Sequence, residues 1–169
     1  LGSSLFKINY YLIITMAEDM ESSIIKTFRN NGYRATPQRI AISRYILKNH
    51  EHPTAQKVYL DIRKTHPTVS LATIYNTINI LKDTGLILEL NLHQGETRFD
   101  PTIEPHAHLL CLKCGNISDW MDPIMPKLIS KISADASFTV TGSIFELKGI
   151  CDSCAKKGDG AVSKTEADE

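Results

Sequence analysis

Four cysteines in two matched pairs constrain this chain more than any other feature. They follow the pattern Cys-x2-Cys-x36-Cys-x2-Cys, with Cys111 and Cys114 in the first pair and Cys151 and Cys154 in the second. Each pair fits a tight turn, and four thiolates together form a closed tetrahedral zinc site. Such a site contributes folding free energy to a small domain. We therefore expect these four residues to hold a structural zinc ion.

A thioredoxin-like redox pair is the alternative explanation for a Cys-x2-Cys sequence. A redox pair of that kind opens a helix after a buried strand, which we expect of neither pair here. It also needs only one pair, whereas this chain has two. The pattern favours zinc.

The remaining composition indicates a globular protein without a membrane span. Apolar residues make up 42% of the 169 residues, which is enough for a core. No stretch approaches the roughly 20 apolar residues that a span requires. The opening run lacks the cleavage site of a signal peptide. We expect a cytoplasmic protein, with residues 1–15 a non-native or disordered extension.

Four helical patterns and a hairpin fill the front half. Thr36, Thr54 and Ser70 are expected helix N-caps, and Gly85 is expected to end the fourth helix. Leucines then alternate from Leu86 to Leu92, as in a strand. A turn over residues 94–96 and a return strand over 97–99 complete the hairpin. The positions expected to face the core are Ile24, Ile25, Phe28, Ile42, Ile46, Ala55, Val58, Tyr59, Ile62, Leu71, Ile74, Ile78 and Leu81.

Helices followed by a hairpin indicate a winged helix-turn-helix over residues 16–100. In that arrangement the fourth helix enters the major groove of double-stranded DNA. Its outward face carries uncharged hydrogen-bonding side chains that can meet base edges or phosphates. An ordinary solvated helix face is an equal alternative from this pattern alone. The outward residues are Thr73, Tyr75, Asn76, Thr77 and Asn79, of which Thr73, Tyr75, Asn76 and Asn79 are the expected DNA contacts.

The back half is predicted to be a small α/β domain over residues 106–155, after a hinge at residues 101–105. Strands are expected at 109–111, 117–120, 138–141 and 144–147, with a helix marked by Ile124, Leu128 and Ile132. Pairing with a second copy would satisfy exposed strand edges. Residues 156–169 are expected to be a disordered tail. The fold class is therefore α+β.

Charge divides between the halves. Residues 17–92 carry ten Lys and Arg against seven Asp and Glu, and residues 93–169 carry eight against twelve. A basic front half suits DNA, and an acidic back half suits a cation.

A second group of metal donors contains no cysteine. His106 and His108 lie on the same side of an extended segment, with Asp100 upstream, Asp119 downstream and His52 in the loop before the third helix. Isolated histidines are most often surface residues, and we assign His50, His66 and His93 to that class. Nitrogen and oxygen donors without thiolate suit Fe(II), Mn(II) or Zn(II).

These motifs resemble the ferric uptake regulator (Fur) family over nearly all of residues 20–156. The resemblance implies a homodimeric, metal-activated transcriptional repressor with structural zinc on the four cysteines and a DNA operator as partner. It also implies that the regulatory metal is held by His52, Asp100, His106, His108 and Asp119. The segments that carry the resemblance are Thr36-Pro37-Gln38-Arg39, His52-Pro53-Thr54-Ala55, Ser70-Leu71-Ala72-Thr73-Ile74-Tyr75-Asn76, His106-Ala107-His108-Leu109-Leu110-Cys111 and the two cysteine pairs.

Aspartate at both carboxylate positions resembles the peroxide-sensing branch of that family, because iron-uptake members commonly have glutamates there. This branch implies Fe(II)-dependent oxidation of His52 or His106, whereas Mn(II) would fill the site without that reaction. A further site of many iron and zinc regulators uses a late histidine, and residues 138–149 contain none.

Other functions remain as alternatives. An iron-uptake repressor, or a zinc-uptake repressor, would use metal only as a corepressor. A zinc enzyme would need three protein ligands, an open water position and a general base, and no such base stands out. A purely structural zinc adaptor would leave the His and Asp donors unexplained. We expect a regulator and not an enzyme.

Overall fold

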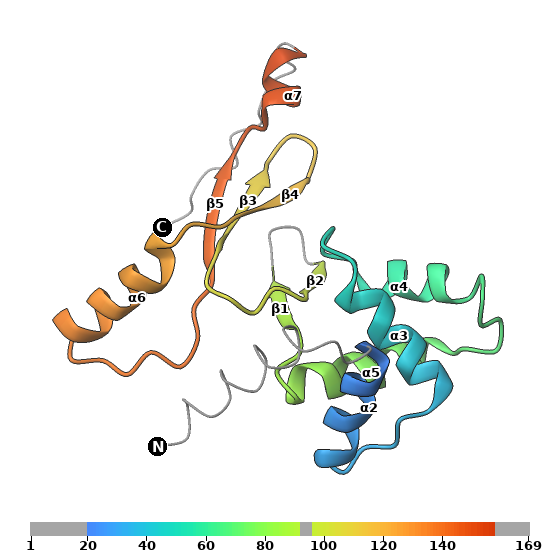
Figure 1. Cartoon of the computed structure of the whole chain (residues 1–169). Helices are drawn as coiled ribbons and strands as arrows, with labels where there is room; N and C mark the ends of the chain where they lie inside the picture. The colour runs from blue at the N-terminus through green and yellow to red at the C-terminus, as the bar shows by residue number, and fades with distance from the viewer. Residues whose placement is uncertain (1–19, 92–95, 158–169) are drawn as a thin grey trace, which may run out of the picture. The chain divides into compact units, whose positions relative to one another are not determined.

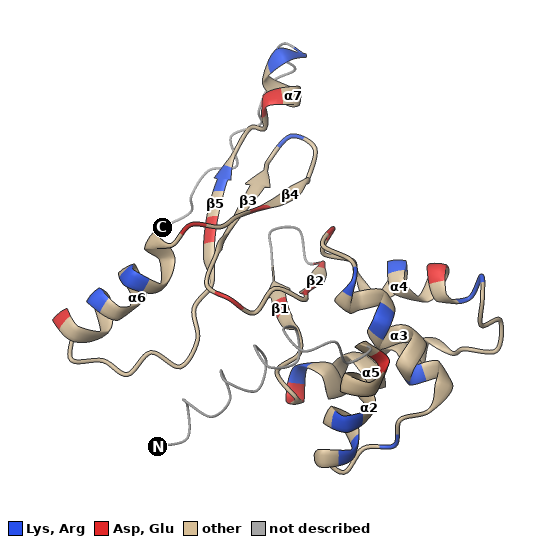
Figure 2. Ribbon diagram, viewed as in Figure 1, with Lys and Arg blue, Asp and Glu red and all other residues tan. Residues whose placement is uncertain are grey.

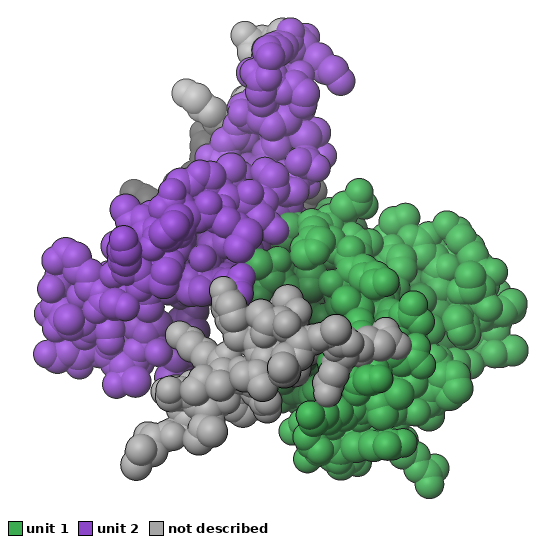
Figure 3. All heavy atoms as spheres, in the orientation of Figure 1, with its two compact units in different colours: residues 1–103 green, residues 104–169 purple. Residues whose placement is uncertain are grey.

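The computed structural model describes residues 20–91 and 96–157, which form two compact units (Figure 3). Unit 1 extends to Ile103 and unit 2 begins at Glu104, so the division falls inside the segment expected to be a hinge. The predictions for residues 1–15, for the turn at residues 94–95 and for most of the tail lie outside the described residues. No helix among the described residues is long and apolar enough to cross a membrane.

Side-chain caps and one glycine mark several of the helix ends of unit 1 (Figure 1). The side-chain oxygens of Thr36, Thr54 and Ser70 each accept a hydrogen bond from the backbone N–H three residues on, which confirms the predicted N-caps. Gly85 follows the fourth helix with a φ of +68°, a conformation that favours glycine. The four helices are α2 (Met20–Asn30), α3 (Pro37–Leu47), α4 (Ala55–Ile62) and α5 (Leu71–Asp83).

The core of unit 1 draws on all four helices and on the hairpin. Three predictions of facing were wrong. Ile25 and Leu71 were expected to face the core, but both are only half-buried and lie outside the core cluster. Thr77 was expected to face outward, but it is fully buried and its hydroxyl donates to the Thr73 carbonyl at 2.7 Å. The backbone carbonyl thus satisfies its one polar group inside the core.

The predicted hairpin is present as β1 (Leu88–Asn91) and β2 (Thr97–Asp100), which pair antiparallel with Leu90 opposite Arg98. The strand begins later than the leucine alternation indicated. Leu86 and Ile87 are both buried instead of alternating. The reason is that the Leu86 N–H still donates to the Leu81 carbonyl at the end of α5.

Unit 2 has a three-stranded sheet in the order β4-β3-β5. The central strand β3 (Ala107–Cys111) pairs antiparallel with β4 (Ile117–Trp120) and parallel with β5 (Phe145–Gly149). Helix α6 (Ile124–Asp135) lies between β4 and β5 in sequence, and the short α7 (Asp152–Lys156) follows β5.

The strand predicted at residues 138–141 is absent from unit 2. A strand exists only where a neighbour accepts and donates its backbone hydrogen bonds, and this segment meets no strand among the described residues. The helix marked by Ile124, Leu128 and Ile132 is confirmed as α6, but these three side chains are exposed.

A hydrogen-bonded cluster links α3 and α4 across the loop that contains His52. The Tyr45 hydroxyl donates to the Asp61 carboxylate at 2.6 Å, and the ammonium groups of Lys64 and Lys57 lie 2.5 and 2.9 Å from the same carboxylate. These donors, Lys64 first, then Tyr45 and Lys57, hold the pKa of Asp61 well below its usual range.

We expect Tyr45→Phe to destabilise the protein at pH 7 by about 1 kcal/mol, a value reduced for partial solvent screening of this bond. Because the folded pKa of Asp61 is depressed, its contribution is present above the unfolded pKa of about 3.9 and is lost as pH falls through the folded pKa. Urea unfolding should therefore show a stability difference that persists from pH 7 down to pH 3, because the Asp61 carboxylate stays ionised in both folded proteins over that range. Tyr33→Phe, which removes a longer and exposed bond to Asp83, is the control and should change stability less. An equal effect of both changes would contradict the assignment.

Candidate metal centres

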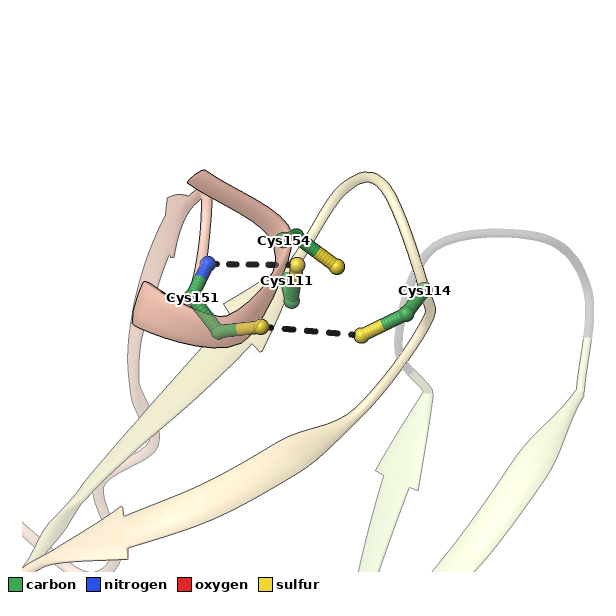
Figure 4. Close-up of side chains that lie close together, drawn as sticks. All are labelled: Cys111, Cys114, Cys151 and Cys154. Carbon is green, nitrogen blue, oxygen red and sulfur yellow. Dashed lines mark hydrogen bonds between the residues drawn. The ribbon is translucent and has the colours of Figure 1, made fainter. Parts of the chain in front are cut away.

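The four cysteines converge on one point of unit 2 (Figure 4). Their sulfurs all lie within 4.8 Å of one another, and the Sγ atoms of Cys114 and Cys151 are 3.8 Å apart. A tetrahedral zinc ion with bonds of about 2.3 Å separates its sulfurs by about 3.8 Å. A disulfide would require about 2.05 Å, and all four cysteines are free. The cluster fits a zinc site.

Local backbone structure shapes both cysteine turns. In the first turn the Gly115 N–H donates to the Cys111 carbonyl at 2.8 Å, and Gly115 has a φ of +70°. In the second turn the N–H of Cys154 donates to the Cys151 carbonyl at 3.0 Å. The Cys151 N–H reaches across to the Cys111 sulfur at 3.3 Å, so one turn donates directly to a ligand atom of the other (Figure 4).

The pKa shifts of the cysteine thiols favour a bound cation. The N–H of Cys151, with backbone N–H groups of Cys114 and Lys113, lowers the pKa of the Cys111 thiol to about 6. Hydrogen bonding with the Cys151 and Cys114 sulfurs raises the pKa of Cys154 to about 12. Four neighbouring sulfurs therefore cannot all lose their protons by themselves. A divalent ion removes this obstacle because it stabilises every thiolate at once.

One feature of the second pair is compatible with the redox alternative, because Cys151 stands at the start of a helix, α7, two residues after β5. However, β5 is half-buried to exposed along its length, and α7 has only five residues. The convergence of all four sulfurs is the stronger argument, because a redox pair needs no second pair beside it.

Unit 2 also brings together three of the five expected regulatory ligands. His108 on β3 is the register partner of Asp119 on β4, and its Nδ1 lies 3.2 Å from Asp119 Oδ1. His106 is two residues before His108, so both project to the same side, and the two ring centroids are 4.4 Å apart. The Nε2 of His106 is 3.6 Å from the same carboxylate oxygen. Both histidines are buried.

The protonation of His106 follows from its neighbour. Its Nδ1 lies 2.7 Å from the Glu104 carbonyl oxygen. A carbonyl can only accept, so Nδ1 carries the proton and Nε2 carries the lone pair that a metal takes. Sequence reasoning missed this role of Glu104, because a backbone carbonyl leaves no mark in a sequence.

Unit 1 brings together the other two expected ligands. His52 and Asp100 are both fully buried, with His52 Nε2 3.8 Å from Asp100 Oδ1. Asp100 ends β2, and its Oδ1 accepts the Thr102 N–H at 2.7 Å. This local turn orients the carboxylate. The Asp-x-Thr spacing was a usable signal for it that the sequence analysis did not exploit.

The donor chemistry of these two groups suits a divalent transition metal. Imidazole nitrogens and carboxylate oxygens without thiolate suit Fe(II), Mn(II) or Zn(II). Buried histidines and carboxylates are costly unless paired or bound to a metal. The residues present therefore fit the expected regulatory ion.

The predicted DNA-reading face lies on α5. Tyr75 is half-exposed, Asn76 and Asn79 are exposed, and Thr73 is half-buried with its hydroxyl 2.9 Å from that of Ser70. The only Lys or Arg of α5 is Lys82 in its last turn, while α2, α3 and α4 carry further basic residues (Figure 2). This distribution leaves hydrogen-bonding side chains at the centre of the face. The DNA contacts remain a prediction.

We expect the purified protein to contain one tightly held zinc ion per chain, and Cys154→Ser to lose it, because three thiolates cannot close the tetrahedron. Zinc content by elemental analysis, together with thermal unfolding, measures both effects. Ser130→Ala is the control, since the Ser130 hydroxyl lies on α6 and donates to the Pro126 carbonyl, away from the four sulfurs, and it should retain zinc. A Cys154→Ser protein with full zinc content and unchanged unfolding would contradict a four-cysteine site.

Comparison with known proteins agrees with this chemistry. The model of the ferric uptake regulator family matches residues 30–148. The peroxide-responsive repressor PerR of Staphylococcus epidermidis is 37% identical over 141 residues, which cover 83% of this chain and 93% of that protein. The Campylobacter jejuni peroxide stress regulator is 30% identical, with a TM-score of 0.61 over 81% of this chain and 100% of that one. The Vibrio cholerae ferric uptake regulator is 25% identical, with a TM-score of 0.62 over 75% and 98%. The chain belongs to the ferric uptake regulator family.

Proposed function

We propose that this protein, a metal-responsive repressor of the ferric uptake regulator family, senses hydrogen peroxide through an Fe(II) ion held by His52, Asp100, His106, His108 and Asp119. The observation that carries the proposal is a donor set without thiolate, buried except at the half-buried Asp119, in which both carboxylates are aspartates. The names of the relatives in Staphylococcus and Campylobacter support the same branch.

The regulatory ion would couple the two units. His52 and Asp100 belong to unit 1, and the other three ligands belong to unit 2. An ion that binds all five would hold the units in one relative orientation. In a homodimer this sets the spacing of the two α5 helices and hence their match to operator half-sites. Metal binding and DNA binding would then strengthen one another by the same factor.

A homodimer is supported by an apolar face that unit 2 does not cover. Ile124, Leu128 and Ile132 follow one side of α6 and are between 38% and 55% exposed. Exposed apolar faces of this kind mark protein interfaces. The outer edge of β5 has no strand beside it among the described residues, and a second copy would pair with it symmetrically.

In the DNA complex, α5 would lie in the major groove with Tyr75, Asn76 and Asn79 toward the bases and Thr73 near its first turn. Asparagine pairs with adenine edges, and hydroxyl groups reach bases or phosphates. Structural zinc on the four cysteines would keep unit 2 folded whether or not the regulatory ion is bound.

Peroxide would be sensed through oxidation of a metal-binding histidine. Fe(II), when bound, would supply one-electron chemistry toward the O–O bond of hydrogen peroxide and would recover that electron from the ring, so that the ion is unchanged overall. At His52 or His106 one ring carbon–hydrogen bond would be replaced by a carbon–oxygen bond, so that the ring loses two electrons and peroxide is reduced to water. The oxidised ring would be a poorer ligand, and the weaker metal binding would lower the affinity for DNA.

Peptide mapping by mass tests the sensing step. The zinc-containing protein is loaded anaerobically with Fe(II) and treated with a small excess of peroxide. We expect a gain of one oxygen atom on the His52 or His106 peptide, and none when Mn(II) replaces Fe(II). The His66 peptide is an internal control, and fragment ions distinguish His52 from His50 on their shared peptide. If every histidine stays intact while Fe(II) still switches DNA binding, the protein is an iron-uptake type repressor.

Coupling between the units is tested by His52→Ala. We expect Mn(II)-dependent operator affinity to fall by about tenfold or more, with zinc content unchanged, because the cysteine cluster lies entirely in unit 2. DNA binding by fluorescence anisotropy with and without Mn(II) measures the effect. His50→Ala, at an exposed histidine two residues upstream, should behave as wild type. Full metal-dependent affinity in His52→Ala would rule out the coupling.

A further inference from the structure

The segment that carries His52 is fastened to strand β2 of the same unit. Thr54 forms an isolated β-bridge with Arg98, and the Phe99 N–H donates to the Pro53 carbonyl at 3.2 Å. The Arg98 guanidinium then donates through Nη1 to the His52 carbonyl at 3.4 Å. Three consecutive residues of the loop are thus held by two consecutive residues of the strand.

The backbone of His52 needs such support. Its φ is +52°, in the left-handed region that residues other than glycine rarely adopt. Strained backbone of this kind persists only where the surroundings fix it. The φ and ψ angles of His52 determine where its imidazole points, so the contact on its carbonyl helps to set the direction of the ring.

Arg98 is well placed to act on both ligands of unit 1. It lies two residues before Asp100 on β2, and residues at that spacing project to the same side of a strand. Its side chain is 30% exposed, and Nη2 lies 3.5 Å from the Glu96 carboxylate. Arg98 therefore has one anchor on the hairpin and one on the His52 loop.

We propose that Arg98 is a positioning residue for the regulatory metal, which it serves by holding the His52 backbone in the conformation that presents the imidazole. The inference rests on the proposed regulatory site. Arg98 binds no metal itself, because a guanidinium has only donors.

Electrostatics and positioning make opposite predictions for the loss of this arginine. Removal of a positive charge near a cation site strengthens cation binding by Coulomb's law. Loss of support for a ligand weakens it, typically by about tenfold or more for residues that orient metal ligands. The direction of the change therefore identifies the role.

The test measures Mn(II) affinity of the full-length, zinc-containing protein by competition with a fluorescent chelator. We expect Arg98→Gln to weaken Mn(II) binding by about tenfold and Arg98→Lys to recover part of the loss, since an ammonium still donates to a carbonyl. Arg63→Gln is the matched control. It removes the same charge from unit 1, where the Arg63 guanidinium lies over the Tyr59 ring, and it should leave the affinity unchanged.

A double-variant cycle separates support of His52 from any other effect. In a His52→Ala background the imidazole is gone, so Arg98→Gln should cause no further loss of Mn(II) affinity. Far-UV circular dichroism and zinc content verify folding of each variant. If Arg98→Gln does not fold, Arg98→Lys takes its place, with a smaller loss in the same direction expected.

Three outcomes would overturn the inference. They are unchanged or tighter Mn(II) binding in Arg98→Gln (or in Arg98→Lys where it takes its place), an equal loss in Arg63→Gln, and an equal loss in the His52→Ala background. If His52→Ala itself leaves Mn(II) affinity unchanged, the proposed regulatory site fails along with the inference. If His52→Ala weakens binding and Arg98→Gln does not, only the role of Arg98 is rejected.

Discussion

The grouping of four cysteine sulfurs at one point, where full deprotonation requires a cation, is the constraint from which the structure of unit 2 can be understood. Among its described residues only Ala107, Leu110, Cys111 and Met125 are buried apolar side chains. Burial on this scale contributes a few kcal/mol, which is too little to order a sheet and two helices. The sulfur cluster joins the β3–β4 turn to the segment after β5, so a bound ion would link the two ends of the unit.

Unit 1, unlike unit 2, has a large apolar core. Its core draws on every helix and on strand β2. Helices α3, α4 and α5 begin at side-chain caps, and α5 keeps uncharged polar residues on its exposed side. The apolar core of unit 1 is thus much larger than that of unit 2.

Local signals accounted for most of what the sequence predicted correctly. Thr36, Thr54 and Ser70 predicted helix starts because a cap is a short-range contact. The cysteine spacing predicted a metal cluster because the two ligands within each pair are also close in sequence.

The errors in the prediction concerned contacts that are not local in sequence. The strand expected at residues 138–141 needs a neighbour that a single chain does not provide among its described residues, and Thr77 is buried because a carbonyl one turn away accepts its hydroxyl. The grouping of His108 with Asp119 follows from strand register, which spacing alone cannot give. The support of His52 by Arg98 depends on a loop lying against a strand 46 residues later in the chain.

The parallel pairing of β3 and β5 explains the long interval between the cysteine pairs. Each pair lies at the carboxyl end of its strand, and Cys111 is opposite Gly149 in the register. Parallel strands bring their carboxyl ends to the same edge of the sheet, whereas antiparallel strands would separate the pairs by the length of a strand. A parallel return requires a crossover of a dozen residues or more, and here β4 and α6 provide it. The 36 intervening residues are thus the length of a crossover and not a property of the ion. An insertion in that crossover would leave the cysteine pairs at the same edge of the sheet, whereas an insertion between the two cysteines of a pair would displace a sulfur.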